Sequence, residues 1–467
     1  MIFTSIEFLT FLAVVLTVYW LRRERRWQNM TLLAASYVFY GWVYPWHAVV
    51  LAASTLIDFA LARRMAMHRE AARRLLWLSV VLNLGLLGLV KYYFSINVPL
   101  AGVATAAGLG GDFLLAKIVL PMGVSFYALK KLAYMIDVSR GTIKPSASWM
   151  NFTLFVSFFP QVIAGPIDRA QKLLPQLAEN RDWRVENFHA AWPLLVMGLF
   201  KKLVVADSVR VIVDQVFLQE EPTQLLVLVG VLGFTLQILA DFSGYTDLSR
   251  GIAFLFGIET SENFAAPYLS LTPGDFWNRW HMTFSFWLRD YVFFPLRRAM
   301  VRRKHLPAGI AVVIPPLFTM LLSGLWHGTG WTFVLWGLYY GVLIAGYQLA
   351  GVRGEFKSAR GWEKVLAWAV MFCLIVFGWL VFRAPSLTWL GHVLLERPFT
   401  RTAQNVTGSL VALAMIAFYA LPLLLKWLID RSAPRSIVLH GSYYALATLA
   451  AIVYFNSSSP DFIYFQF

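Results

Sequence analysis

The chain has 467 residues, of which 59% are hydrophobic and 14% are charged, and its mean hydropathy is +0.62. Soluble domains average about 25% charged residues, so this composition excludes an ordinary soluble enzyme and predicts an all-α polytopic membrane protein. The net charge of +15 comes from short basic clusters beside apolar stretches. The positive-inside rule explains such clusters without a nucleic-acid partner.

The first apolar segment, residues 1–20, has neither a basic start nor a small-residue cleavage site, and Arg22-Arg23 begins a basic cluster after it. We therefore expect an uncleaved membrane span that starts outside the cytoplasm. By the same rule, four more basic clusters are expected in cytoplasmic loops: Arg63-Arg64, Arg73-Arg74, Lys201-Lys202 and Arg302-Arg303-Lys304.

Further apolar stretches follow in chain order. They cover residues 31–43, 48–62, 75–90, 118–136, 152–164, 192–200, 225–240, 310–322, 331–349, 365–381, 410–425 and 443–454, and residues 203–216 form a weakly amphipathic segment. A perpendicular span needs about 20 residues, so the pattern predicts roughly 11–13 membrane helices, with the shorter ones tilted or buried in the bundle. Residues 99–112 are interpreted as a linker or shallow re-entrant segment, and residues 168–184 as an amphipathic surface helix.

Several polar residues interrupt this apolar scaffold. Residues 241–250 place two acids, an arginine, three Ser/Thr hydroxyls and a tyrosine directly after an apolar span, which favours an interior cluster of ion pairs and hydrogen bonds over direct chemistry. Lys130 and Lys131 lie in an apolar stretch and are expected to reach the membrane interface, with contact to an anionic donor as the alternative. The single cysteine, Cys373, excludes an internal disulfide framework and a cysteine-rich metal site.

Two histidines, His281 and His327, each follow a tryptophan, and His327 lies in the apolar run of residues 317–338. An ionisable group at membrane depth is costly, so it usually faces a bundle interior or a cavity and often serves function. The alternative is a structural histidine bonded to a neighbouring carbonyl. The small residues Gly324 and Gly328 are expected to leave room beside His327 for an approaching chain.

The common soluble catalytic motifs are absent from the sequence: it has no Gly-x-Ser-x-Gly elbow, P-loop, His-Glu-x-x-His or Cys-x-x-Cys motif. No histidine is followed by the aspartate of a His-x4-Asp acyltransferase site. What remains is proton transfer by histidine in an aromatic cavity. This suits a neutral imidazole that removes the proton of a hydroxyl as it attacks a thioester or ester.

Three blocks carry a resemblance to a known family: residues 262–268, residues 276–291 (FWNRWHMTFSFWLRDY) and Trp326-His327-Gly328. They resemble the membrane-bound O-acyltransferase family, and in particular its alginate O-acetyltransferase branch. Residues 35–42, 241–245, 382–384 and 462–467 also resemble that branch, so the likeness covers nearly the whole chain. Residues 276–287 and 165–169 resemble the D-alanyl transfer protein of teichoic acid as well.

The resemblance implies one domain over residues 1–467, with N-terminal spans in 1–95, a catalytic core in 118–350 and C-terminal spans in 362–467. It implies helices, some re-entrant or broken, around a central tunnel in the inner membrane of a bacterium. The donor would be acetyl-CoA or another cytoplasmic thioester carrier, with no metal and no tightly bound cofactor. The acceptor would be a hydroxyl of an exported polysaccharide or of a periplasmic acyltransferase partner.

By position, the resemblance makes His327 the catalytic histidine and His281 the supporting one. Six further residues are candidates for the tunnel lining or for substrate contact: Trp326, Trp280, Asn278, Tyr245, Asp241 and Arg289. Two alternatives stay open. One is D-alanyl transfer, and the other is a transporter or scaffold of a polysaccharide-export complex, which the lack of paired halves with matching broken helices disfavours.

Overall fold

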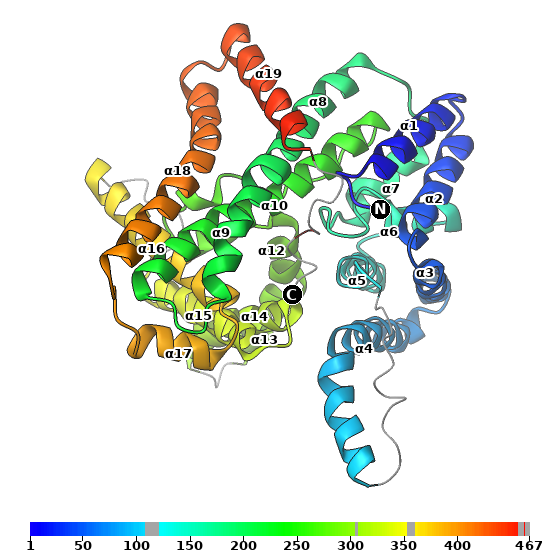
Figure 1. Cartoon of the computed structure of the whole chain (residues 1–467). Coiled ribbons are helices and arrows are strands. Elements are labelled where there is room, and N and C mark those ends of the chain that lie inside the picture. Colours follow the sequence, from blue (N-terminus) through cyan, green and yellow to red (C-terminus); the bar gives the residue numbers. More distant parts are fainter. Residues whose placement is uncertain (108–120, 304–306, 353–359, 456–461, 463–467) are drawn as a thin grey trace. The chain divides into compact units, whose positions relative to one another are not determined.

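The structure is a computed structural model that describes residues 1–107, 121–303, 307–352, 360–455 and 462. Within these residues, seven helices are long and apolar enough to cross a membrane, and two shorter apolar helices, α1 (Ile6–Trp20) and α19 (Ile437–Val453), accompany them. The seven are α3 (Pro45–Met67), α4 (Ala72–Ala106), α10 (Gln224–Leu255), α14 (Ala308–His327), α15 (Trp331–Leu349), α16 (Gly361–Arg383) and α18 (Ala403–Ser432) (Figure 1). The predicted all-α polytopic class is confirmed.

Shorter helices connect these spans. They are α2 (Arg25–Gly41), η1 (Arg69–Ala71), α5 (Val124–Arg140), α6 (Trp149–Ser157), α7 (Ala170–Ala178), α8 (Val185–Leu199), η3 (Phe200–Ala206), α9 (Asp207–Phe217), η4 (Pro267–Leu269), α11 (Pro273–Trp277), α12 (Met282–Leu288), η5 (Arg289–Phe293), α13 (Phe294–Val301) and α17 (Leu387–Leu395). The predicted count of membrane helices included some of these: α6 has nine residues and α9 has eleven. The segments η3 and η5 are π-helical, which makes both helical paths irregular.

The structure adjusts two predicted segments. Helix α4 continues to Ala106, so the first part of the expected linker at residues 99–112 is helical, and residues 108–112 lie outside the described part of the chain. Helix α7 confirms an amphipathic helix within residues 168–184, since Leu173 and Leu177 are fully buried.

The chain divides into two compact units, one of residues 1–191 and 249–261, the other of residues 192–248 and 262–467. In the first unit, Arg63-Arg64 and Arg73-Arg74 are exposed at the end of α3 and the start of α4. Their orientation toward the cytoplasm stays a prediction, as does the three-part division of the domain.

The first unit corrects the expectation for the two lysines of α5. The Nζ of Lys131 lies 3.3 Å from Asp58 Oδ2, and the Nζ of Lys130 donates to the carbonyl of Phe155 at 3.0 Å and to Gln161 Oε1 at 2.8 Å. The Lys131 side chain is 0% exposed, so the prediction that these lysines extend to an interface is wrong. A buried ammonium with a carboxylate or carbonyl partner is compensated where it lies.

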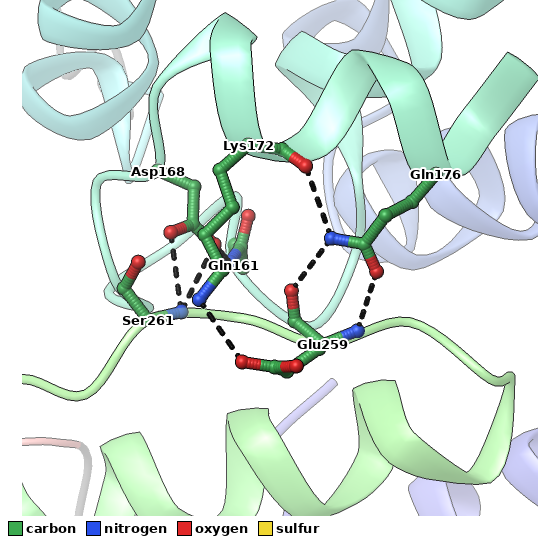
Figure 2. A network of polar contacts seen from close by, with 6 residues as sticks. All are labelled: Gln161, Asp168, Lys172, Gln176, Glu259 and Ser261. Carbon is green, nitrogen blue, oxygen red and sulfur yellow. Dashed lines mark hydrogen bonds and ion pairs between the residues drawn. The ribbon is translucent and has the colours of Figure 1, made fainter.

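A polar network holds the end of the first unit in place (Figure 2). The carboxylate of Asp168 accepts from Gln161 Nε2 at 2.6 Å and from the backbone N–H of Ser261 at 3.1 Å. The side-chain amide of Gln176 accepts from Glu259 N at 2.8 Å and donates to Glu259 O at 2.9 Å. These bonds satisfy backbone groups of Glu259 and Ser261, which lie outside any helix, just before the chain enters the second unit.

The second unit corrects the expectation for Lys201-Lys202. The pair lies in η3, inside a continuous helical path, and not in a loop. Lys201 Nζ is 2.6 Å from Asp247 Oδ2, and Lys202 Nζ is 2.9 Å from Asp207 Oδ1 and 3.1 Å from Asp241 Oδ1. Two lysine side chains therefore take part in the ion-pair cluster that was predicted for residues 241–250.

Candidate active site

His327 is the last residue of α14, and it is 6% exposed. The rings of Trp326, Trp336 and Phe382 lie 4.9, 5.1 and 5.3 Å from its imidazole centroid, each nearly perpendicular to it. Phe382 comes from α16 and Trp336 from α15, so three spans enclose the histidine. His327 is therefore buried among aromatic rings, as the sequence predicted; its catalytic role stays a prediction.

The glycines beside His327 do not leave the space that was expected. A Cβ on Gly324 would lie 2.2 Å from the carbonyl oxygen of Phe333, and a Cβ on Gly328 would lie 2.0 Å from the Phe333 ring. Helices α14 and α15 thus pack closely at these positions (Figure 1). The expectation that Gly324 and Gly328 make room for a substrate is wrong, because the neighbouring helix fills that room.

His281 lies at the N-cap of α12, where its backbone φ of 42° is in the left-handed region. That conformation is uncommon for a residue with a side chain and persists when the surroundings enforce it. Two backbone bonds do so: Met282 N donates to Asn263 O at 2.9 Å, and Ala265 N donates to Arg279 O at 3.0 Å. The segment before η4 is thereby fixed against the turn that carries His281.

The side chain of Asn263 determines the tautomer of His281. Its Oδ1 accepts from the backbone N–H of Thr283 at 3.1 Å and lies 3.2 Å from His281 Nδ1. A backbone N–H can only donate, so this atom is the amide oxygen, and Nδ1 must carry a proton to bond to it. The neutral ring then has its lone pair on Nε2. Burial lowers the pKa of His281 to about 3, so the ring is neutral at physiological pH.

Two aromatic residues bring the histidines together. The Phe284 ring lies 5.1 Å from the ring of His281 and 5.9 Å from that of His327. Trp326 stacks on Phe284 at 4.3 Å and lies 6.2 Å from His281 and 4.9 Å from His327. Sequence reasoning proposed Trp326 but missed Phe284 and Asn263, because their spacing from the histidines carries no signal without the fold.

Two further candidates, Asn278 and Arg289, line one cavity of about 130 Å³ together with Trp277, Ser285 and Thr319. The Arg289 side chain is 43% exposed and pairs with Asp290 at 2.9 Å. An adjoining cavity of about 220 Å³ shares Ile344 and Gln348 with the first and is lined by Arg297. The two cavities therefore present two guanidinium groups.

The other three candidates lie in the surrounding structure. Trp280 is 1% exposed and packs on Phe264 and Trp379 at 5.0 and 4.8 Å. Asp241 is ion-paired to Lys202, and the next residue, Phe242, contacts the His281 ring at 4.7 Å. Tyr245 packs on Phe462 at 4.9 Å, and Phe462 in turn contacts Phe242 at 5.4 Å. The roles predicted for these residues stay predictions.

Residues 8–384 match the model of the MBOAT, membrane-bound O-acyltransferase, family. A probable alginate O-acetylase AlgI of Pseudomonas aeruginosa is 36% identical over 394 residues, which cover 83% of this chain and 73% of that protein. A peptidoglycan O-acetyltransferase of Helicobacter pylori is 30% identical over 392 residues, 77% of this chain and 71% of its own. A teichoic acid D-alanyltransferase of Bacillus subtilis is 28% identical over 274 residues, 56% of this chain and 68% of its own.

Proposed function

The chain belongs to the membrane-bound O-acyltransferase family, and we propose that it moves an acetyl group from a cytoplasmic thioester donor to a hydroxyl across the membrane. It is a multi-pass membrane O-acyltransferase. The choice of acetyl rests on two relatives at 30% identity or more whose names state O-acetyl transfer. The observation that supports the site is the pairing of His327 and His281 on Phe284 and Trp326.

In the proposed reaction, the acceptor oxygen attacks the thioester carbonyl carbon while the neutral imidazole of His327 takes the hydroxyl proton. The carbon–sulfur bond then breaks, and the imidazolium returns the proton to the departing thiolate. Atoms and charge balance without a cofactor. His281, whose Nδ1–H is engaged by Asn263, presents its Nε2 lone pair as the supporting group.

The donor would enter through the adjoining cavities of Arg289 and Arg297. Guanidinium groups bind phosphate oxygens in a bidentate manner, and acetyl-CoA or a phosphopantetheine carrier supplies such phosphates. The Asn278 side chain lines the same cavity and would position the acyl arm. The donor would then be a substrate that dissociates after each turnover.

The acceptor is proposed to be an exported, alginate-like polysaccharide or a periplasmic acyltransferase partner, in the inner membrane of a bacterium. The bacterial alginate O-acetylase relatives support this choice. The second candidate is D-alanyl transfer, which the D-alanyltransferase relative favours over a shorter stretch of the chain. Family membership argues against a transporter or scaffold without chemistry.

The test supplies membranes containing the protein with radiolabelled acetyl-CoA and counts label in base-labile ester linkage. Positioned proton transfer contributes about 10²- to 10⁴-fold in rate, so His327→Ala is expected to lower transfer at least about a hundredfold while the protein still folds. His392→Ala, on an exposed histidine of α17, is the matched control and is expected to transfer normally. Normal transfer by a folded His327→Ala protein would remove His327 from catalysis, and labelling only from a D-alanyl carrier would select the second candidate.

A further inference from the structure

A larger cavity, of about 450 Å³, lies between α10, α16, the end of α17 and the chain that follows it. Its walls are almost entirely apolar, with Val231 from α10, Phe377 and Leu380 from α16, and Phe399 beyond α17. It shares no lining residue with the cavities of Arg289 and Arg297. Its volume falls within the range of about 300–1,000 Å³ that is typical of small-molecule sites. We call it the α10–α16 groove.

The α10–α16 groove runs along membrane-spanning helices from one of their ends inward. On α10 its lining residues extend from Gln224, the first residue of the helix, to Leu232. At 1.5 Å per residue this is about 12 Å of helix. On α16 they extend to Leu380, close to the end of that helix at Arg383. The groove therefore begins where two spans end, which is the level of lipid headgroups, and continues into the hydrocarbon region.

Charged residues gather at the headgroup end of the groove. Glu221, which precedes α10, pairs with Arg397 at 3.0 Å and with Arg401 at 3.3 Å. The backbone ties these arginines to the groove, since Gln224 N donates to Pro398 O and Leu225 N to Phe399 O, both at 3.1 Å. Within this cluster of three side chains, two guanidinium groups share one carboxylate. Of the two neighbouring acids, Glu396 pairs with His392 and Glu220 is exposed.

The guanidinium of Arg397 also has unused hydrogen-bonding capacity. Its Nε is buried and has no hydrogen-bond partner within the described part of the chain. A buried N–H donor without a partner costs free energy. An anionic oxygen at the groove mouth would satisfy this donor, and charge-assisted hydrogen bonds of this kind are the strong ones.

We propose that the α10–α16 groove binds an anionic phospholipid of the bilayer. One acyl chain lies along Val231, Phe377 and Leu380, and the phosphate contacts Arg397 and Arg401. An apolar channel with two arginines at its membrane-boundary end matches the two parts of such a lipid. A polysaccharide would find almost no polar partners in the groove walls.

The single cysteine of the chain provides the test, because Cys373 is exposed and lines the groove. The full chain is labelled there with bimane, a small fluorophore, and reconstituted into phosphatidylcholine nanodiscs. Brominated phosphatidylglycerol or brominated phosphatidylcholine is then added as a quencher. Since one basic residue is worth about a fivefold preference for anionic lipid, phosphatidylglycerol is expected to quench at an about fivefold lower mole fraction.

Variants at the mouth should change this preference in both directions. Arg397→Gln with Arg401→Gln is expected to abolish it, and Glu221→Gln, which frees both arginines, is expected to raise it by about another fivefold. The control places the reporter on an exposed face of α18, as Cys373→Ser with Phe418→Cys, where both lipids should quench more nearly alike.

Three results would overturn the proposal. They are equal quenching of the Cys373 reporter by the two lipids, a preference for phosphatidylglycerol that survives in the folded double-arginine variant, and no quenching by either lipid. The last would mean that the groove is closed or that a partner's helix fills it. None of these readouts depends on acyl transfer, so the lipid site and the proposed reaction are tested separately.

Discussion

Replacement of Asn263 by leucine should disable His281 without touching its ring. Asn263 is fully buried, and its Oδ1 accepts from Thr283 N, from Thr283 Oγ1 and from His281 Nδ1. In Asn263→Leu, all three donors lose this acceptor. The Thr283 hydroxyl can rotate to another partner, so the cost is counted for the Thr283 N–H and the His281 Nδ1–H. Each buried donor left unsatisfied costs about 1–3 kcal/mol, so the free energy of unfolding should fall by about 2–6 kcal/mol.

Asn263→Asp separates a positioning role from a purely structural one. A carboxylate retains an acceptor for both donors, so this variant should fold. Its negative charge favours the imidazolium form, which raises the pKa of His281 from its burial-lowered value. Acyl transfer by Asn263→Asp should therefore be lost at a higher pH than in the parent as the pH is lowered. Thr283→Val removes only the hydroxyl donor, and its pH profile should match that of the parent.

The tautomer of the His281 ring can be measured by NMR of protein labelled with ¹⁵N-histidine. The His281 signals are those that are lost in His281→Gln. We expect a protonated Nδ1 and an unprotonated Nε2. A ring protonated at Nε2 in the parent would refute the reasoning, as would Asn263→Leu protein that melts and transfers like the parent. The NMR result holds or fails whether or not the acyl group is acetyl.

Other predictions follow from contacts already described. Gly328→Ala should lower the melting temperature and acyl transfer together, because the new Cβ would lie 2.0 Å from the Phe333 ring. The control is Gly408→Ala on α18, which has open space around it and should be tolerated. Normal melting of Gly328→Ala would contradict the packing. Lys131→Met should cost about 3–5 kcal/mol of stability, because it leaves a buried carboxylate unpaired. Adding Asp58→Asn should recover much of that loss in thermal unfolding. The folded pKa of His281 is lowered to about 3, so between that pH and about 6.5 the unfolded chain binds one more proton than the folded chain. The free energy of unfolding should therefore decrease as the pH is lowered through this window. His281→Gln should flatten that dependence in melting scans, and an unchanged slope would contradict it.

Local patterns in the sequence predicted much of the fold, and long-range partners account for what they missed. Hydropathy identified the long spans because a membrane helix consists of a continuous run of apolar residues. The prediction that Lys131 reaches the membrane interface failed because its ion-pair partner, Asp58, lies 73 positions earlier in the sequence. The residues near Lys131 in sequence give no sign of that partner. Lys201 was misplaced for the same reason, since Asp247 lies on another helix.

The candidate site shows the same division. His327 and His281 stood out because each is a titratable group in apolar or aromatic sequence. Asn263 was part of a block that carried the family resemblance, but its bond to His281 depends on a turn with positive φ that no propensity predicts. Gly324 was recognised as small, yet only the structure shows that a helix backbone occupies the space beside it.

The close approach of α14 and α15 also bears on how mutational data for this enzyme should be interpreted. On α15, a Cβ at Gly337 would lie 2.4 Å from the carbonyl oxygen of Met320, and one at Gly341 would lie 2.9 Å from Leu317 Cα. Together with Gly324 and Gly328, these positions should appear intolerant in a saturation screen for activity. Such intolerance would report the geometry that holds His327 at its helix end, so a residue's sensitivity alone would not identify it as part of the chemistry.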